Sequence, residues 1–254
     1  MLGVIALLTD FGLDDQYVFQ VKSVIRSITD EEIVDITHTV PPFDVRTGAF
    51  VLWQAAKYLP AGSTAVAVVD PGVGGGRRCV AIRTKRSLFV GPDNGLMWEA
   101  ANSHVILEAR SIESERLVAR RGGTFDGRDV FAPAAAHLVE GYPFEEVGPP
   151  ARGLVELSLP KPEFSTGGIR ATVLHVDRFG NAILNLDGGE FAAWAGGRTS
   201  FEVKTSGSSL RLSLHGSYES IQGTGLVVGS SGLVEVSSPL RGAAGIGGEV
   251  LISA

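Results

Sequence analysis

The stretch VVDPGVGGGRR, residues 68–78, carries an apolar run into an aspartate and then into a glycine-rich turn that closes on two arginines. The apolar run, residues 65–69, is typical of a strand that is covered on both faces of a sheet. A strand that stops on Asp70 places a charge where the regular backbone ends, and functional sites are often built at such points. The stretch therefore predicts a covered sheet with Asp70 at its edge.

The same pattern extends over the first 160 residues, where short apolar runs alternate with segments of helical spacing. The other runs cover residues 4–8, 33–36, 88–90 and 105–107. Near-continuous Val/Ile runs favour parallel strands, and alternation with helices favours an α/β architecture. We expect an α/β domain over residues 1–160, with a mostly parallel sheet and helices on both faces.

Three helices are expected in this domain. Apolar residues recur at helical spacing within residues 14–28, and Asp14 or Asp15 could cap that helix. Asp44 can cap a second helix that Pro60 ends, and Pro133 can open a third.

The pattern of apolar residues changes after the segment PKPEFSTGG, residues 160–168, which is interpreted as a linker. Beyond it, short alternating or apolar segments such as ATVLHVD, NAILNL and GLVEV are separated by glycine and serine turns, and no helical period is evident. This pattern predicts an all-β, barrel-like domain over residues 168–254.

Charge and cysteine content limit the functional classes. Lys and Arg total 22 against 28 for Asp and Glu, which gives a net charge of -6, and no basic run exceeds two residues. Nucleic acid is therefore not an expected partner. The single cysteine, Cys79, excludes an intramolecular disulfide, is expected to be a small buried thiol, and fits a reducing cytoplasm. Neither a signal peptide nor an apolar run of about 20 residues is present, so we expect a soluble cytoplasmic protein with no membrane partner.

The glycine-rich turn does not match a nucleotide-binding fingerprint. It lacks the G-K-[ST] ending of a P-loop, and Arg77 stands where G-x-G-x-x-G requires its third glycine. An isolated Asp-Pro-Gly is usually only a turn. However, a glycine loop that folds back could return Arg77 to Asp70, and the resulting ion pair would keep the carboxylate ionised and oriented.

Two further segments carry candidate residues. In LLTDFGLDDQYV, residues 7–18, Asp10 follows an apolar run, and a carboxylate at a strand end suits the hydroxyls of a ribose. In HTVPPFDV, residues 38–45, Phe43 follows Pro-Pro and, taken alone, is interpreted as a buried loop aromatic.

The segment FDGRDVFAPAAAHL, residues 125–138, holds Asp126 together with Arg128, Asp129 and His137. Arg128 and Asp129 are interpreted as a structural pair, and His137 as a satisfied histidine on a helix.

Two common hydrolytic chemistries have no support in the sequence. The five histidines show neither H-x-H nor H-E-x-x-H, so a zinc site is not expected. G-x-S-x-G is absent, so an α/β-type serine hydrolase would have no nucleophile elbow.

Six motifs, in order and almost from end to end, carry a family resemblance: TDFGLDDQYV, VDITHTVPPFDV, VVDPGVGGGRR, VGPDNG, FDGRDVFAPAAAHL and DRFGNAILNL. Together they resemble the S-adenosylmethionine (SAM) hydrolases, also called SAM hydroxide adenosyltransferases, which are relatives of the fluorinase and chlorinase. The resemblance implies an N-terminal α/β domain, a C-terminal β-barrel and a homotrimer. It also implies that SAM binds between the N-terminal domain of one subunit and the C-terminal domain of its neighbour, without a metal or organic cofactor.

The resemblance points to the hydrolase branch. The halogenases carry a tyrosine where this chain has Asp70, and the fluorinase has a long insertion where only IRTKRS joins two strands here. The implied reaction is hydrolysis of SAM to adenosine and L-methionine by an oriented water or hydroxide that attacks C5′. The alternatives are a SAM- or adenosine-binding protein with weak or no catalysis, and a SAM-dependent 5′-halogenase.

The resemblance also assigns catalytic positions. Asp70 and Arg77 match two members of the family's Asp-Arg-His set, which holds the attacking water. The family's histidine lies in FHGRD, whereas this chain reads FDGRD, so Asp126 takes its place. His137, about three helical turns further on, could compensate only if its helix turned it inward.

Five positions match substrate contacts of the family. Asp10 matches the ribose-binding aspartate, and Phe43 matches the aromatic beside the sugar and methionine. Asn181 matches the asparagine near the adenine, Tyr218 is expected to stack on the adenine, and Ser230 falls where the methionine end is held.

Overall fold

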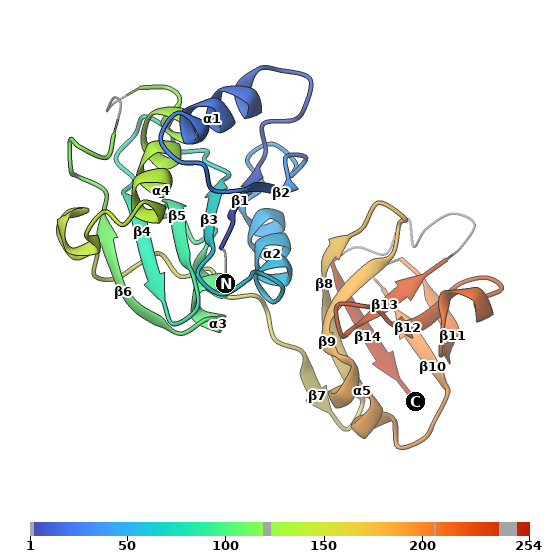
Figure 1. The fold of residues 1–254 in the computed structure, drawn as a ribbon. Helices are drawn as coiled ribbons and strands as arrows, with labels where there is room; N and C mark the ends of the chain where they lie inside the picture. Colours follow the sequence, from blue (N-terminus) through green and yellow to red (C-terminus); the bar gives the residue numbers. More distant parts are fainter. Residues whose placement is uncertain (1–2, 119–122, 206, 239–247) are drawn as a thin grey trace. The chain divides into compact units, whose positions relative to one another are not determined.

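The computed structural model describes residues 3–118, 123–205, 207–238 and 248–254. The chain divides into two compact units, Met1–Ser158 and Leu159–Ala254, which are described separately (Figure 1). No helix within the described residues is both long enough and apolar enough to cross a membrane.

The N-terminal unit is built on a sheet whose described strands lie in the order β2-β1-β3-β5-β4-β6. Their bounds are β1 (Ile5–Thr9), β2 (Ile33–Thr37), β3 (Thr64–Val68), β4 (Cys79–Thr84), β5 (Leu88–Pro92) and β6 (Ile106–Ser111). Strands β2, β1, β3 and β5 are parallel, whereas β4 runs antiparallel to both of its neighbours. Only residues 85–87 connect β4 to β5, and a parallel pair would need a crossover of a dozen or more residues.

Helices cover both faces of this sheet (Figure 1). Residues of α1 (Tyr17–Arg26) and α4 (Ala132–Val139) pack with Ile5 and Leu7 of β1. Residues of α2 (Val45–Ala56) and α3 (Trp98–Ser103) belong to the core that contains Ala6 and Leu8. Successive residues of β1 thus face opposite layers, and the predicted α/β class is confirmed.

The helix starts match the expectations in part. The Asp44 side chain accepts a hydrogen bond from Thr47 N at 3.0 Å and caps α2, as predicted. Pro133 lies in the first turn of α4, which directly follows the π-helix η1 (Gly127–Phe131). The predicted cap by Asp14 or Asp15 is wrong, because α1 begins only at Tyr17 and has no side-chain cap.

The C-terminal unit is a closed barrel, as the predicted fold class required. Its strands are β8 (Gly168–Val176), β9 (Ala182–Asp187), β10 (Ser200–Lys204), β11 (Ser209–His215), β12 (Gly225–Val228), β13 (Leu233–Ser237) and β14 (Glu249–Ser253). Strand β14 pairs with both β10 and β8, which closes the ring. Part of the expected linker forms a short strand, β7 (Glu163–Ser165), that pairs with β8.

One helix, α5 (Gly188–Ala195), interrupts the barrel strands and was not expected from the sequence. Asp187 accepts hydrogen bonds from Gly189 N and Glu190 N and caps it, and Gly196 ends it at a left-handed φ of 57°. Eight residues are too few to display a helical period, so only these end signals could have revealed it.

Candidate active site

Predicted catalytic and substrate-binding residues of the N-terminal unit meet at one edge of its sheet. Strands β1 and β3 are parallel neighbours with Thr9 aligned to Val68, so Asp10 and Asp70 follow them at the same edge. Because β4 runs in the opposite direction beyond β5, it begins at this edge, where Arg77 lies two residues before it. The topology therefore brings Asp10 together with Asp70 and Arg77, which follow it by 60 residues or more.

The glycine-rich turn folds back on Asp70. Gly72 N donates to Asp70 Oδ1 at 3.2 Å, and Gly74 has the positive φ of 74° that a side chain would disfavour. Arg77 Nε and Nη2 both donate to Asp70 Oδ2, at 2.9 and 2.5 Å. The ion pair predicted from the spacing of these two residues is confirmed.

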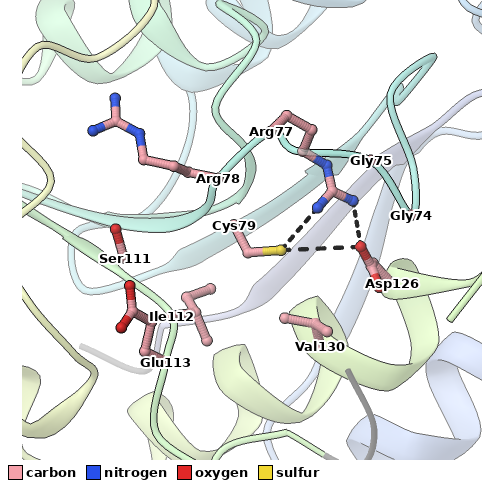
Figure 2. A pocket seen from close by; sticks show the side chains of 10 residues that line it. All are labelled: Gly74, Gly75, Arg77, Arg78, Cys79, Ser111, Ile112, Glu113, Asp126 and Val130. Carbon is pink, nitrogen blue, oxygen red and sulfur yellow. Dashed lines mark hydrogen bonds and ion pairs between the residues drawn. The ribbon is translucent and has the colours of Figure 1, made fainter. Parts of the chain in front are cut away.

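Arg77 also contacts Asp126 and Cys79 (Figure 2). Its Nη2 forms an ion pair with Asp126 Oδ2, and its Nη1 donates to Cys79 Sγ at 3.0 Å. The Arg77 Cζ atom lies 5.5 Å from the centroid of the Phe131 ring. Burial acts to lower the pKa of Arg77, but hydrogen bonds to the two aspartates outweigh it and raise that pKa above its ordinary value. The guanidinium therefore stays charged and fixed between two carboxylates.

These residues border two cavities. The main cavity, of about 460 Å³, is lined by Asp10, Phe43, Asp70 and Asp126, four of the residues predicted from the sequence. A side cavity of about 240 Å³ is lined by Arg77, Cys79 and again Asp126. Asp126 thus lines both cavities.

An aromatic cluster that the sequence analysis missed forms part of the main cavity wall. Phe11, Tyr17 and Phe125 all line it and meet edge to face, with ring centroids 5.3 to 6.2 Å apart. All three lie inside the quoted motifs, but their mutual contact depends on the fold.

Asp10 and Phe43 are joined through the backbone. Phe43 N donates to Asp10 Oδ2 at 2.8 Å, and Gly12 N donates to His38 O at 2.7 Å, so two contacts hold the loop after β1 against the loop before α2. Burial raises the pKa of Asp10; the Phe43 N–H opposes this, and the charge of Asp70 adds to it. The Phe43 side chain is 65% exposed, so the interpretation of Phe43 as a buried aromatic is wrong.

Phe43 has a left-handed φ of 65°, which is strained for a residue with a Cβ. We expect Phe43→Gly to have a free energy of unfolding about 1 kcal/mol higher than Phe43→Ala, because only glycine removes this strain. Both variants lose the aromatic ring and should show the same raised KM for the substrate. Urea denaturation of the matched pair measures the difference, and equal stabilities would show that the backbone is not strained there.

The three substrate-binding residues predicted in the C-terminal unit share a separate cavity. Asn181, Tyr218 and Ser230 line a space of about 560 Å³ within this unit. Asn181 Nδ2 donates to Asp177 Oδ2 at 2.9 Å, and its Oδ1 accepts from Ser237 Oγ at 2.6 Å. The Asn181 amide therefore has a fixed orientation before any ligand binds.

Tyr218 is held by a residue that the sequence analysis missed. Its hydroxyl donates to Glu235 Oε2 at 2.7 Å, while its ring remains half exposed. Burial raises the pKa of Glu235 above its usual range, and the charge of Asp177 acts in the same direction. A glutamate within the otherwise apolar segment GLVEV was the signal for this residue.

The remaining residues singled out in the sequence do not line the main cavity. Arg128 Nε and Nη2 bind the two carboxylate oxygens of Asp129 at 2.6 and 2.9 Å, which confirms the structural pair. His137 is half-buried on α4 and does not line the main cavity. Cys79 is only partly buried, not fully buried as expected, because it lies on the cavity side of β4 beside Arg77.

Comparison with known proteins identifies the family of both units. Residues 5–148 match the model of the SAM hydroxide adenosyltransferase N-terminal domain, and residues 171–245 match that of the C-terminal domain. A protein from Salinispora arenicola named (R)-S-adenosyl-L-methionine hydrolase is 45% identical over 72% of each chain. One of the same name from Thermus thermophilus is 44% identical over 70% of this chain and 72% of its own.

More distant and structural relatives agree with this assignment. A fluorinase from Actinoplanes sp. is 28% identical over 72% of this chain and 71% of its own. A crystal structure of an uncharacterized conserved protein from Thermotoga maritima matches with a TM-score of 0.91 and 32% identity, covering 99% of this chain and all of that one. The chain belongs to the SAM hydroxide adenosyltransferase family.

Proposed function

We propose that this protein hydrolyses SAM to adenosine and L-methionine, using a water molecule held by Asp70, Arg77 and Asp126. The observation that carries the proposal is the convergence of two buried carboxylates on one guanidinium at a cavity that also contains Asp10 and Phe43. Curated relatives at 38 to 45% identity named as SAM hydrolases support the same reaction.

The chemistry requires positioning more than acid catalysis. The oxygen of water forms a bond to C5′ while the C5′–S bond breaks. The electron pair of the C5′–S bond moves to sulfur, so methionine leaves as a neutral thioether. Orienting the water for in-line attack can lower the barrier by roughly 7 to 11 kcal/mol in favourable cases. The water loses its proton to a carboxylate and then to solvent.

Asp70 and Asp126 are proposed to have different roles in the reaction. Asp70 Oδ2 accepts two hydrogen bonds from Arg77 and Oδ1 accepts one from Gly72 N, so its proposed role is to orient the water and balance charge. Asp126 Oδ2 is bound to Arg77, but Oδ1 receives no hydrogen bond from the described residues. This oxygen is proposed to accept a proton of the water, at the position that histidine holds in FHGRD.

Asp10 and Phe43 are proposed to bind the ribose and the adjoining sugar–methionine region. Asn181, Tyr218 and Ser230 are proposed to contact adenine and methionine from a neighbouring subunit of a cytoplasmic homotrimer. Sedimentation velocity tests this assembly, and a monomer that retains full activity would contradict it.

The direct test is incubation of purified protein with SAM, with and without chloride and fluoride, followed by chromatography. We expect adenosine and methionine in equal amounts, at a rate independent of halide. A halogenated nucleoside would establish a 5′-halogenase instead, and tight SAM binding without any product would establish a non-catalytic binding protein.

A further inference from the structure

The main cavity has more negative charge than the basic residues in the described part of the chain neutralise. Asp10, Asp70 and Asp126 line it, and none of the described lining residues is basic. Within the described part of the chain, Arg77 is the one basic residue that forms ion pairs with these carboxylates. Among the described residues, one guanidinium against three carboxylates leaves an excess of two negative charges.

Asp126 shares its cation, Arg77, with Asp70. Asp70 already gives Arg77 an ion partner through two hydrogen bonds. The Asp126 side chain is nevertheless only 6% exposed, and its Oδ1 faces no donor among the described residues. Two buried carboxylates that share one guanidinium keep a net negative charge that is costly to bury, so a ligand with positive charge is the expected additional partner.

The arrangement favours an organic cation over a metal ion. Among the described residues, no three or more His, Cys, Asp or Glu side chains are placed so that they could hold a metal. The cavity instead combines the carboxylates with the aromatic side chains of Phe11, Tyr17 and Phe125. A sulfonium, whose charge is spread over sulfur and its carbon substituents, suits such a mixed wall.

We infer that Asp126 is a specificity-determining residue that makes the site select the sulfonium cation of SAM over the neutral thioether S-adenosylhomocysteine. The two ligands differ by one methyl group and one positive charge, so charge is the main basis for discrimination. This inference rests on the proposed function, because it places the sulfonium in the main cavity.

The same charge excess affects the rest of the reaction. An anionic nucleophile such as hydroxide, fluoride or chloride is repelled by the carboxylates, whereas neutral water is not. Cleavage removes the sulfonium charge, since adenosine and the thioether are uncharged at the reacting atoms. The electrostatic attraction is therefore lost when the bond breaks, which favours release of the products.

Calorimetric titration with two inert ligands tests the inference without turnover. Sinefungin carries a protonated amine in place of the sulfonium, and S-adenosylhomocysteine is neutral at that position. We expect wild-type protein to bind sinefungin at least about tenfold more tightly, and Asp126→Asn to reduce this preference at least about fivefold. Asparagine can still accept a hydrogen bond from Arg77, and circular dichroism and thermal unfolding check that the variant folds.

A matched control changes the net charge elsewhere. Asp30 has a fully exposed side chain in a surface pair with Arg26, so Asp30→Asn should leave the preference unchanged. An Asp126→Asn variant with the wild-type preference would overturn the inference, as would wild-type protein that binds the two ligands equally or binds neither. Clear discrimination without adenosine formation from SAM would contradict only the proposed hydrolysis, so the two failures are distinguishable.

Discussion

Replacing Asp70 by asparagine is expected to lower kcat for SAM hydrolysis by about 100- to 1,000-fold, the range seen when one preorganised electrostatic group is removed from an active site. Asparagine fills the same space and can accept one hydrogen bond, but it lacks the charge that orients the water. Arg77 keeps Asp126 as an ion partner, so no buried guanidinium is left unpaired. Affinity for sinefungin should fall by no more than about tenfold, through the loss of one negative charge from the cavity.

Two matched variants separate charge from position at this site. Asp70→Glu keeps the charge but displaces the carboxylate by one methylene, and a displacement of about 1 Å can cost on the order of 100-fold in rate. Asp35→Asn removes a carboxylate from β2, on the surface, and should leave kcat unchanged. Steady-state adenosine formation measures kcat for Asp70→Asn, Asp70→Glu and Asp35→Asn. A wild-type kcat in Asp70→Asn would remove Asp70 from the mechanism.

The sequence was sufficient to predict the arrangement of Asp70 and Arg77. An apolar run before Asp70 defines the strand, and the glycines between the two residues allow the chain to reverse over a short distance. Both signals are local, and the ion pair closes within seven residues. The α/β class and the barrel were equally accessible, because they follow from hydrophobic period and turn composition.

Other features depend on how segments distant in the sequence are placed in the fold, which hydrophobic periodicity does not encode. Cys79 contacts Arg77 because β4 starts on the cavity side of the sheet edge, and the antiparallel direction of β4 is evident only from the short connection to β5. Phe43 combines a left-handed backbone with a hydrogen bond to Asp10, which is 33 residues away. The FDGRD motif located Asp126, but the coordinates were needed to show that it lines two cavities and that its Oδ1 receives no hydrogen bond from the described residues.

Replacing Arg77 by methionine is expected to abolish activity and to lower the free energy of unfolding by about 3 to 5 kcal/mol, the usual effect of breaking a buried ion pair by removing one partner. The Asp70 and Asp126 side chains are only 5% and 6% exposed, and they would face each other without a cation. Urea denaturation measures the loss of stability.

The second-site variant decides whether that loss is electrostatic. In the Arg77→Met background, Asp126→Asn removes one of the two unpaired charges, so the double variant should be more stable than Arg77→Met alone while remaining inactive. Arg77→Lys should be intermediate, because one ammonium cannot reproduce the separate contacts that Nε, Nη1 and Nη2 make with Asp70, Cys79 and Asp126. If Asp126→Asn instead lowered stability further in the methionine background, the structural role of Arg77 would come from packing and not from charge.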